Sequence, residues 1–214
     1  MEKKTLFICI PCGKNADFGF FKSFAQSIGE IMHSWNTAII TESSPYVVES
    51  RNQISRKVLE FDKKSQLKVD YVLWIDSDMV FSPEHLKKLI GRLEEGNDIV
   101  SALYYNLFNG KEKPLAMKRA GERYELIERQ KLGKGLTEVD AVGFGFIAIK
   151  FDVFRRLEGK YGNRIFDIRY LKGGSIIGED QVFCERAKEA GYKIMLDPTI
   201  LVKHIKGTIP SKQA

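Results

Sequence analysis

The chain has 214 residues, of which 43% are hydrophobic and 29% are charged. This is the composition of a folded globular protein of one domain, and it excludes a disordered or fibrous chain. Lys and Arg number 34 against 28 Asp and Glu, which gives a formal net charge of +6. Such a small excess suits phosphate-bearing ligands, but it does not indicate nucleic acid as a partner.

Cysteine usage and hydropathy indicate the compartment. Cys9 and Cys12 form a C-x-x-C, but the second pair that a zinc site needs is missing, so we expect reduced thiols. The apolar run before Pro11 is too short for a signal peptide, and no run is long enough to span a bilayer. We therefore expect a cytoplasmic protein with no integral membrane segment, and leave peripheral contact with a membrane open.

Apolar runs and helical spacings alternate through the first half of the chain. Short apolar runs that end at turn residues predict strands, and apolar residues at helical spacing predict helices. This alternation is typical of a parallel, doubly wound sheet with right-handed crossovers. The predicted strands are residues 5–11, 37–40, 71–75 and 98–104, and the predicted helices are 18–32, 47–61 and 83–95.

The second half has a different pattern. Residues 114–119 and 123–128 alternate loosely, as short antiparallel strands do, and the Gly-rich stretch 132–135 is expected to be a mobile connector. The last residues, 207–214, are expected to form a tail or a lid. Further apolar strands are predicted at 139–149 and 193–202, and helices at 151–157 and 179–191.

Two carboxylates follow the most apolar predicted strand. Residues 71–75 read Tyr-Val-Leu-Trp-Ile and run directly into Asp76-Ser77-Asp78. Ligands of open α/β sheets bind at the carboxyl ends of strands, so a site is expected here. A divalent cation with phosphate ligands would neutralise the two charges, because Mg²⁺ or Mn²⁺ takes one or two carboxylates plus substrate oxygens. The alternative is a turn that caps the helix beginning near Ser82.

Three further positions could carry chemistry, and each has an ordinary structural explanation as well. Glu179-Asp180 opens a helix, where the dipole favours carboxylates, yet such a residue could also be a general base. His204 ends the last apolar strand and is either an unremarkable core or surface residue or a metal ligand. Arg51, before Asn52, could hold a phosphate or a base, or be solvated.

The order of these features along the chain resembles that of the nucleotide-sugar-dependent glycosyltransferases of the GT-A fold, most closely family 2. A D-x-D alone is weak, but a D-x-D after a buried strand, followed about a hundred residues later by E-D and then a histidine, is fairly specific. The residues that carry the resemblance are Ile10-Pro11, Ser50-Arg51-Asn52, residues 74–78, 81–86 and 142–147, Glu179-Asp180 and His204.

The resemblance implies an α/β fold, a Rossmann-like three-layer sandwich with a mostly parallel central sheet and a small antiparallel acceptor-side portion. Residues 1–214 would form a single domain. Residues 1–105 would be the half that binds the nucleotide sugar, and residues 106–214 the acceptor-side half with the catalytic base and the late histidine.

The resemblance also implies roles for individual residues. Asp78 would ligate Mn²⁺ or Mg²⁺, Asp76 would contact the metal or the ribose, and His204 would complete the metal site. Asp180 would be the base that deprotonates the acceptor hydroxyl, with Glu179 positioning sugar or acceptor. The residues that would bind the nucleotide sugar are Pro11, Cys12, Gly13, Glu42, Arg51, Asp76 and Ser77.

The implied activity is metal-dependent transfer of one sugar from a UDP- or GDP-sugar to an acceptor hydroxyl, with inversion. The chain lacks the Q-x-x-R-W of processive synthases, which favours single-sugar transfer. The acceptor and the oligomeric state are not indicated. Three alternatives are a sugar-phosphate nucleotidyltransferase, a phosphatase of the haloacid dehalogenase type, and a non-catalytic domain that binds a nucleotide sugar or carbohydrate. The phosphatase is disfavoured because Met79-Val80 follows the D-x-D, and because the D-x-D lies on the third strand rather than the first.

Overall fold

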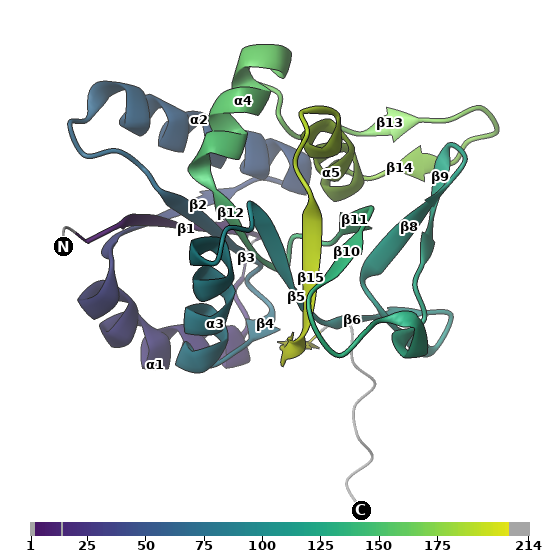
Figure 1. The fold of residues 1–214 in the computed structure, drawn as a ribbon, viewed down its shortest axis with the longest axis horizontal. Coiled ribbons are helices and arrows are strands. Elements are labelled where there is room, and N and C mark those ends of the chain that lie inside the picture. The colour runs from purple at the N-terminus through teal and green to yellow at the C-terminus, as the bar shows by residue number, and fades with distance from the viewer. Residues whose placement is uncertain (1–2, 14, 206–214) are drawn as a thin grey trace, which may run out of the picture.

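A seven-stranded sheet forms the middle of the protein in the computed structural model, which describes residues 3–13 and 15–205 (Figure 1). The predicted tail or lid at 207–214 lies outside the described residues. The strands lie in the order β10 (Thr137–Val139), β15 (Ile194–Leu201), β5 (Ile99–Leu103), β12 (Phe146–Lys150), β3 (Tyr71–Ile75), β1 (Thr5–Cys12) and β2 (Asn36–Ser43).

Five of these strands run in one direction. β1 is parallel to β2 and to β3, and β15 is parallel to β5. β12 is antiparallel to both of its neighbours, β3 and β5, and β10 is antiparallel to β15. The α/β class with a mostly parallel central sheet is therefore confirmed. The position of β12 between β3 and β5 was not predicted. Only one helix separates β3 from β5 along the chain, and strands connected in this way are usually neighbours in the sheet.

Helices cover both faces of the sheet, which gives three layers (Figure 1). Alternate residues of a strand point to opposite faces, so Leu6 and Ile8 belong to one core and Phe7 and Cys9 to the other. One face is covered by α1 (Phe18–Ser34) and α3 (Pro83–Glu94). The other is covered by α2 (Val47–Lys64), α4 (Phe151–Tyr161) and α5 (Glu179–Glu189).

Small antiparallel sheets hold the remaining strands, and those of β6–β9, β11, β13 and β14 lie beside the β15 end of the central sheet (Figure 1). This confirms the predicted antiparallel portion, although of its strands only β8, β9 and β11 lie wholly or largely within predicted strands. The sheets are β6 (Tyr105–Phe108) with β7 (Lys111–Pro114); β8 (Ala116–Ala120) with β9 (Arg123–Leu126) and β11 (Ala141–Val142); β13 (Arg169–Tyr170) with β14 (Ile176–Ile177); and β4 (Met79–Val80) with β16 (Lys203–His204). A 3-10 helix spans Arg129–Lys131.

The predicted strand at 139–149 is divided by its two glycines. Val142 ends β11, Phe146 begins β12, and the residues between them follow neither sheet. A Cβ atom at Gly143 or Gly145 would collide with the Tyr104 side chain, whose hydroxyl accepts a hydrogen bond from the Gly145 amide at 3.0 Å. The kink sends the Phe144 side chain into the core.

Candidate active site

A tight turn follows β3 and carries the D-x-D. The Asp76 amide donates to the Gly145 carbonyl at 3.0 Å, and the Met79 amide donates to the Asp76 carbonyl at 3.1 Å. The Ser77 carbonyl accepts from the Asp17 amide at 2.9 Å, which ties the turn to the start of α1. The backbone around both carboxylates is therefore held by one bond within the turn and by bonds to two distant parts of the chain.

His204 reaches Asp78 because β16 pairs with β4. The register places His204 opposite Met79, one residue from Asp78, and the His204 Nε2 atom lies 3.3 Å from Asp78 Oδ2. Burial disfavours the charged imidazolium, but the Asp78 carboxylate, helped by Asp76, outweighs this and raises the pKa of His204. The structure thus brings together two residues that were predicted to share a site and that lie far apart in the sequence.

Arg51 lies beneath the site rather than in it. Its side chain is only 4% exposed, and its guanidinium stands over the ring of Phe144 at 5.0 Å. Nη2 is 3.4 Å from Asp76 Oδ1, and Nε is 3.5 Å from Glu179 Oε1. One buried cation therefore connects the D-x-D with the E-D pair. Burial raises the pKa of Asp76, the nearby Asp78 and Glu179 charges add to this, and Arg51 opposes it.

Glu179 and Asp180 form the first turn of α5, so they are held by a rigid element. Burial, with the repulsion of the neighbouring Glu179, raises the pKa of Asp180 to about 7, although Arg51 works in the opposite direction. A carboxylate whose pKa lies near neutrality can take a proton from a ligand hydroxyl and release it again at neutral pH. Asp180 thus has the protonation behaviour that a general base needs.

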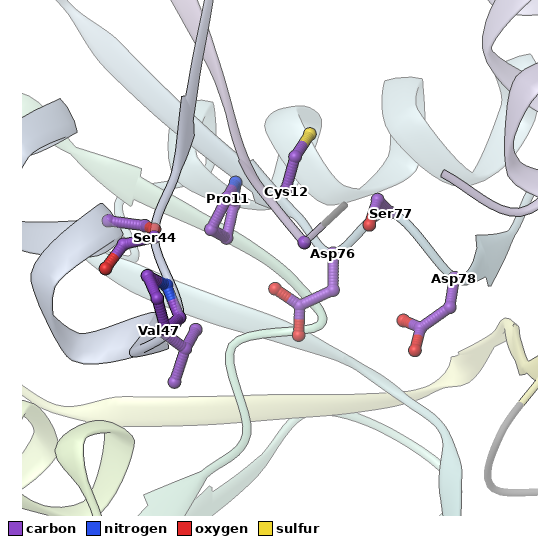
Figure 2. A pocket seen from close by; sticks show the side chains of 10 residues that line it. Pro11, Cys12, Ser44, Val47, Asp76, Ser77 and Asp78 are labelled. Atoms are coloured by element: carbon purple, nitrogen blue, oxygen red, sulfur yellow. The ribbon is translucent and has the colours of Figure 1, made fainter. Parts of the chain in front are cut away.

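A cleft of about 240 Å³ opens beside the D-x-D. In Figure 2 the carboxylates of Asp76 and Asp78 project to the same side, and Ser44 and Val47 stand across the view from them. The lining residues come from the carboxyl ends of β1, β2 and β3 and from the start of α2. They are Pro11, Cys12, Gly13, Ser44, Pro45, Val47, Ser50, Asp76, Ser77 and Asp78.

Most of the residues predicted to bind the nucleotide sugar line this cleft, but two do not. Pro11, Cys12, Gly13, Asp76 and Ser77 do, and they share the cleft with Asp78. Glu42 lies opposite Pro11 in the β1–β2 register, yet its carboxylate is paired with Lys57 on α2. Arg51, as described above, is buried behind Asp76.

Sequence reasoning missed the wall formed by Ser44, Pro45, Val47 and Ser50. The strand order could have predicted this wall. Because β2 is parallel to β1, the residues that follow β2 must lie at the same end of the strands as Pro11. It also missed Tyr104, whose hydroxyl holds the Gly145 segment against which the D-x-D turn is bonded.

The donor atoms present are compatible with a divalent cation. Two ligand atoms at right angles around an ion lie about 3 Å apart when each is about 2.1 Å from the ion, close to the Asp78–His204 separation. No group of three or more His, Cys, Asp or Glu residues arranged to hold a metal occurs within residues 3–13 and 15–205. Mg²⁺ and Mn²⁺ are commonly bound by one or two carboxylates together with water and substrate phosphates, so a site with few protein ligands is compatible with either ion.

Comparison with known proteins supports the class that the fold and the site suggest. The model of glycosyl transferase family 2 matches residues 65–158, and the predicted resemblance to this family is therefore confirmed. The matched region contains both carboxylates of the D-x-D but ends before Glu179, Asp180 and His204. It supports a glycosyltransferase-like function, with a nucleotide sugar as the implied donor.

The fold is also found among solved structures. The crystal structure of A197 from STIV aligns with 92% of this chain and 82% of its own, with a TM-score of 0.57 and 17% identity. At this identity the likeness shows the fold alone. The search of curated proteins gave no match. Within the described residues, every helix is too short or too polar to cross a membrane.

Proposed function

We propose that this protein is a metal-dependent glycosyltransferase that moves one sugar from a nucleoside diphosphate sugar to an acceptor hydroxyl. The observation that carries the proposal is the contact of Arg51 with both Asp76 and Glu179, which holds the two acidic motifs side by side. In this proposal residues 1–105 supply the donor side and residues 106–214 the acceptor side.

Asp180 is the base in the proposed reaction. It takes the proton of the acceptor hydroxyl while that oxygen forms a bond to the anomeric carbon of the sugar. The bond from this carbon to the diphosphate breaks in the same displacement, and the nucleoside diphosphate leaves with the electron pair. Because the attack comes from the face opposite the leaving group, the anomeric configuration inverts. The neighbouring Glu179 positions the sugar or the acceptor.

Asp78 and His204, with Asp76 beside them, would hold Mn²⁺ or Mg²⁺. A bound divalent cation supplies electrostatic stabilisation of the negative charge that develops on the departing diphosphate. The donor lies in the cleft against Pro11, Cys12, Gly13 and Ser77 in this proposal. The UDP- or GDP-sugar is expected there because the cleft stands at the carboxyl ends of β1 and β2.

The test is a thermal-shift screen of UDP-, GDP- and dTDP-sugars, each with and without Mn²⁺, followed by an assay for released nucleoside diphosphate. A donor at about 100 times its dissociation constant should stabilise the fold by roughly 2.7 kcal/mol. In Asp78→Ala we expect a cooperative melt, because Asp78 lies in the turn after β3 and belongs to neither hydrophobic core, but no metal-dependent shift and no transfer.

The matched control is Asp98→Ala. It removes a carboxylate just before β5, at the end of the strands opposite the D-x-D, where Asp98 pairs with Lys150. It should keep the metal-dependent shift. Binding of a donor with no release of nucleoside diphosphate, even by slow hydrolysis, would instead indicate a non-catalytic binding domain. Release of inorganic diphosphate from a nucleoside triphosphate and a sugar phosphate would indicate a nucleotidyltransferase.

A further inference from the structure

The cleft beside the D-x-D has an unusual charge balance for a site that takes a diphosphate. Among its described lining residues none is Lys or Arg, and the charged ones are Asp76 and Asp78. A cation at the D-x-D would offset these charges on one wall. A phosphate in the cleft still needs hydrogen-bond donors on another wall, because a buried anion is costly unless it is hydrogen-bonded.

The facing wall is the start of α2. This helix has 18 residues and begins at Val47, which lines the cleft. Its N-cap residue, Tyr46, makes no side-chain cap bond, and the first intrahelical bonds come from the Glu49 and Ser50 amides to the Tyr46 carbonyl. The amides of Val47 and Val48 thus belong to the orphan donors of the first turn, where the helix dipole favours an anion.

Ser50 supplies a second, independent observation. It is 1% exposed and lines the cleft, and its hydroxyl has no hydrogen-bond partner. Ser55, five residues further along α2, is similarly buried at 2% exposed, but its hydroxyl donates to the Arg51 carbonyl at 2.8 Å. A buried hydroxyl without a partner is rare and calls for an explanation, and a ligand in the cleft would provide one.

We propose that the first turn of α2, with the Ser50 hydroxyl, is an anion subsite that takes a phosphate group of the nucleoside diphosphate. The inference rests on the donor class of the proposed function. The Ser50 hydroxyl rotates to donate to a phosphate oxygen, and the Val47 and Val48 amides donate beside it. A phosphate held by these donors would share the cleft with the carboxylates of the D-x-D, which would hold the cation that offsets its charge.

The test compares Ser50→Ala with Ser55→Ala by calorimetric titration of UDP, GDP, uridine and guanosine in the presence of Mg²⁺. For the nucleoside diphosphate that binds, Ser50→Ala should raise the dissociation constant about tenfold or more, because a hydrogen bond to a charged group is lost. Binding of the matching nucleoside should not change. Urea denaturation should show no loss of stability in Ser50→Ala, since the hydroxyl has no partner in the free protein.

Ser55→Ala should behave in the opposite way, with lower stability and an unchanged dissociation constant. The inference is overturned if Ser50→Ala binds the nucleoside diphosphate as tightly as the unchanged protein does. It is also overturned if the substitution raises the dissociation constants of the nucleoside and of the nucleoside diphosphate by the same factor, or if neither UDP nor GDP binds. The titrations measure binding alone and require no sugar transfer. If they give the expected dissociation constants while no transfer is detected, the subsite is upheld and the proposed activity is refuted.

Discussion

Arg51→Met tests whether the buried guanidinium holds the two acidic motifs together. Methionine keeps an unbranched stem between Phe144 and Phe166, which the guanidinium faces at 5.0 and 6.0 Å, but it removes the charge. Asp76 and Glu179 then lose their common cation. Their side chains are only 29% and 14% exposed, so water screens the two carboxylates incompletely and their charges repel each other.

The expected loss of stability is about 3 kcal/mol. Removing one partner of a buried ion pair costs roughly 3–5 kcal/mol, and the partial exposure of Asp76 places the change at the lower end. Arg56→Met is the matched control, because Arg56 lies on the same helix and pairs with Glu49 where the side chains are 40% and 43% exposed. This exposed pair should contribute no more than about 1 kcal/mol.

Urea denaturation of both variants measures the difference. The reasoning is refuted if Arg51→Met is no less stable than Arg56→Met. A second readout is the pH dependence of transfer: Arg51 lowers the pKa of Asp180, so its removal should move the rise in rate to a higher pH than in the unchanged protein. A purely structural role for Arg51 would leave this midpoint unchanged.

Two further predictions follow from the site. The pKa of Asp180 is raised in the fold to about 7, so its contribution to stability is largest below the unfolded pKa and is lost as pH rises through about 7. Asp180→Asn should therefore abolish transfer yet be more stable than the unchanged protein by roughly 1–3 kcal/mol at pH 8, with the gap closing near pH 4 in urea melts; equal stability at both pH values would contradict the assigned burial. Cys12 lines the cleft, whereas Cys9 and Cys184 are buried. A thiol reagent should label one site per native chain, and a bound nucleoside diphosphate should slow that labelling; labelling unaffected by a nucleotide that binds would place it elsewhere.

Much of the fold could be predicted from local pattern. Buried strands such as Tyr71–Ile75 are marked by continuous apolar residues, and α3 by Ser82 and Pro83 at its start. These signals depend on neighbours in sequence, so they are readable without tertiary contacts. The position of the D-x-D at the edge where strands end also follows, because every parallel strand of a sheet presents its carboxyl end there.

Long-range pairing was decided only by the tertiary structure. The antiparallel entry of β12 between β3 and β5 depends on contacts between residues far apart, and so does the short β4–β16 ladder that brings His204 to Asp78. Arg51 illustrates the same limit. Its sequence neighbourhood suggested a ligand contact, but aromatic rings from two distant segments enclose it, and it became the buried link between two acidic motifs.

The sequence by itself determined which chemical groups the site contains and in what order. Only the tertiary structure decided which of them face the cleft, which stand behind it and which hydroxyl lacks a partner. The physical reason is that side-chain type is a local property, whereas burial, hydrogen-bond satisfaction and pKa depend on what the rest of the chain places around each group.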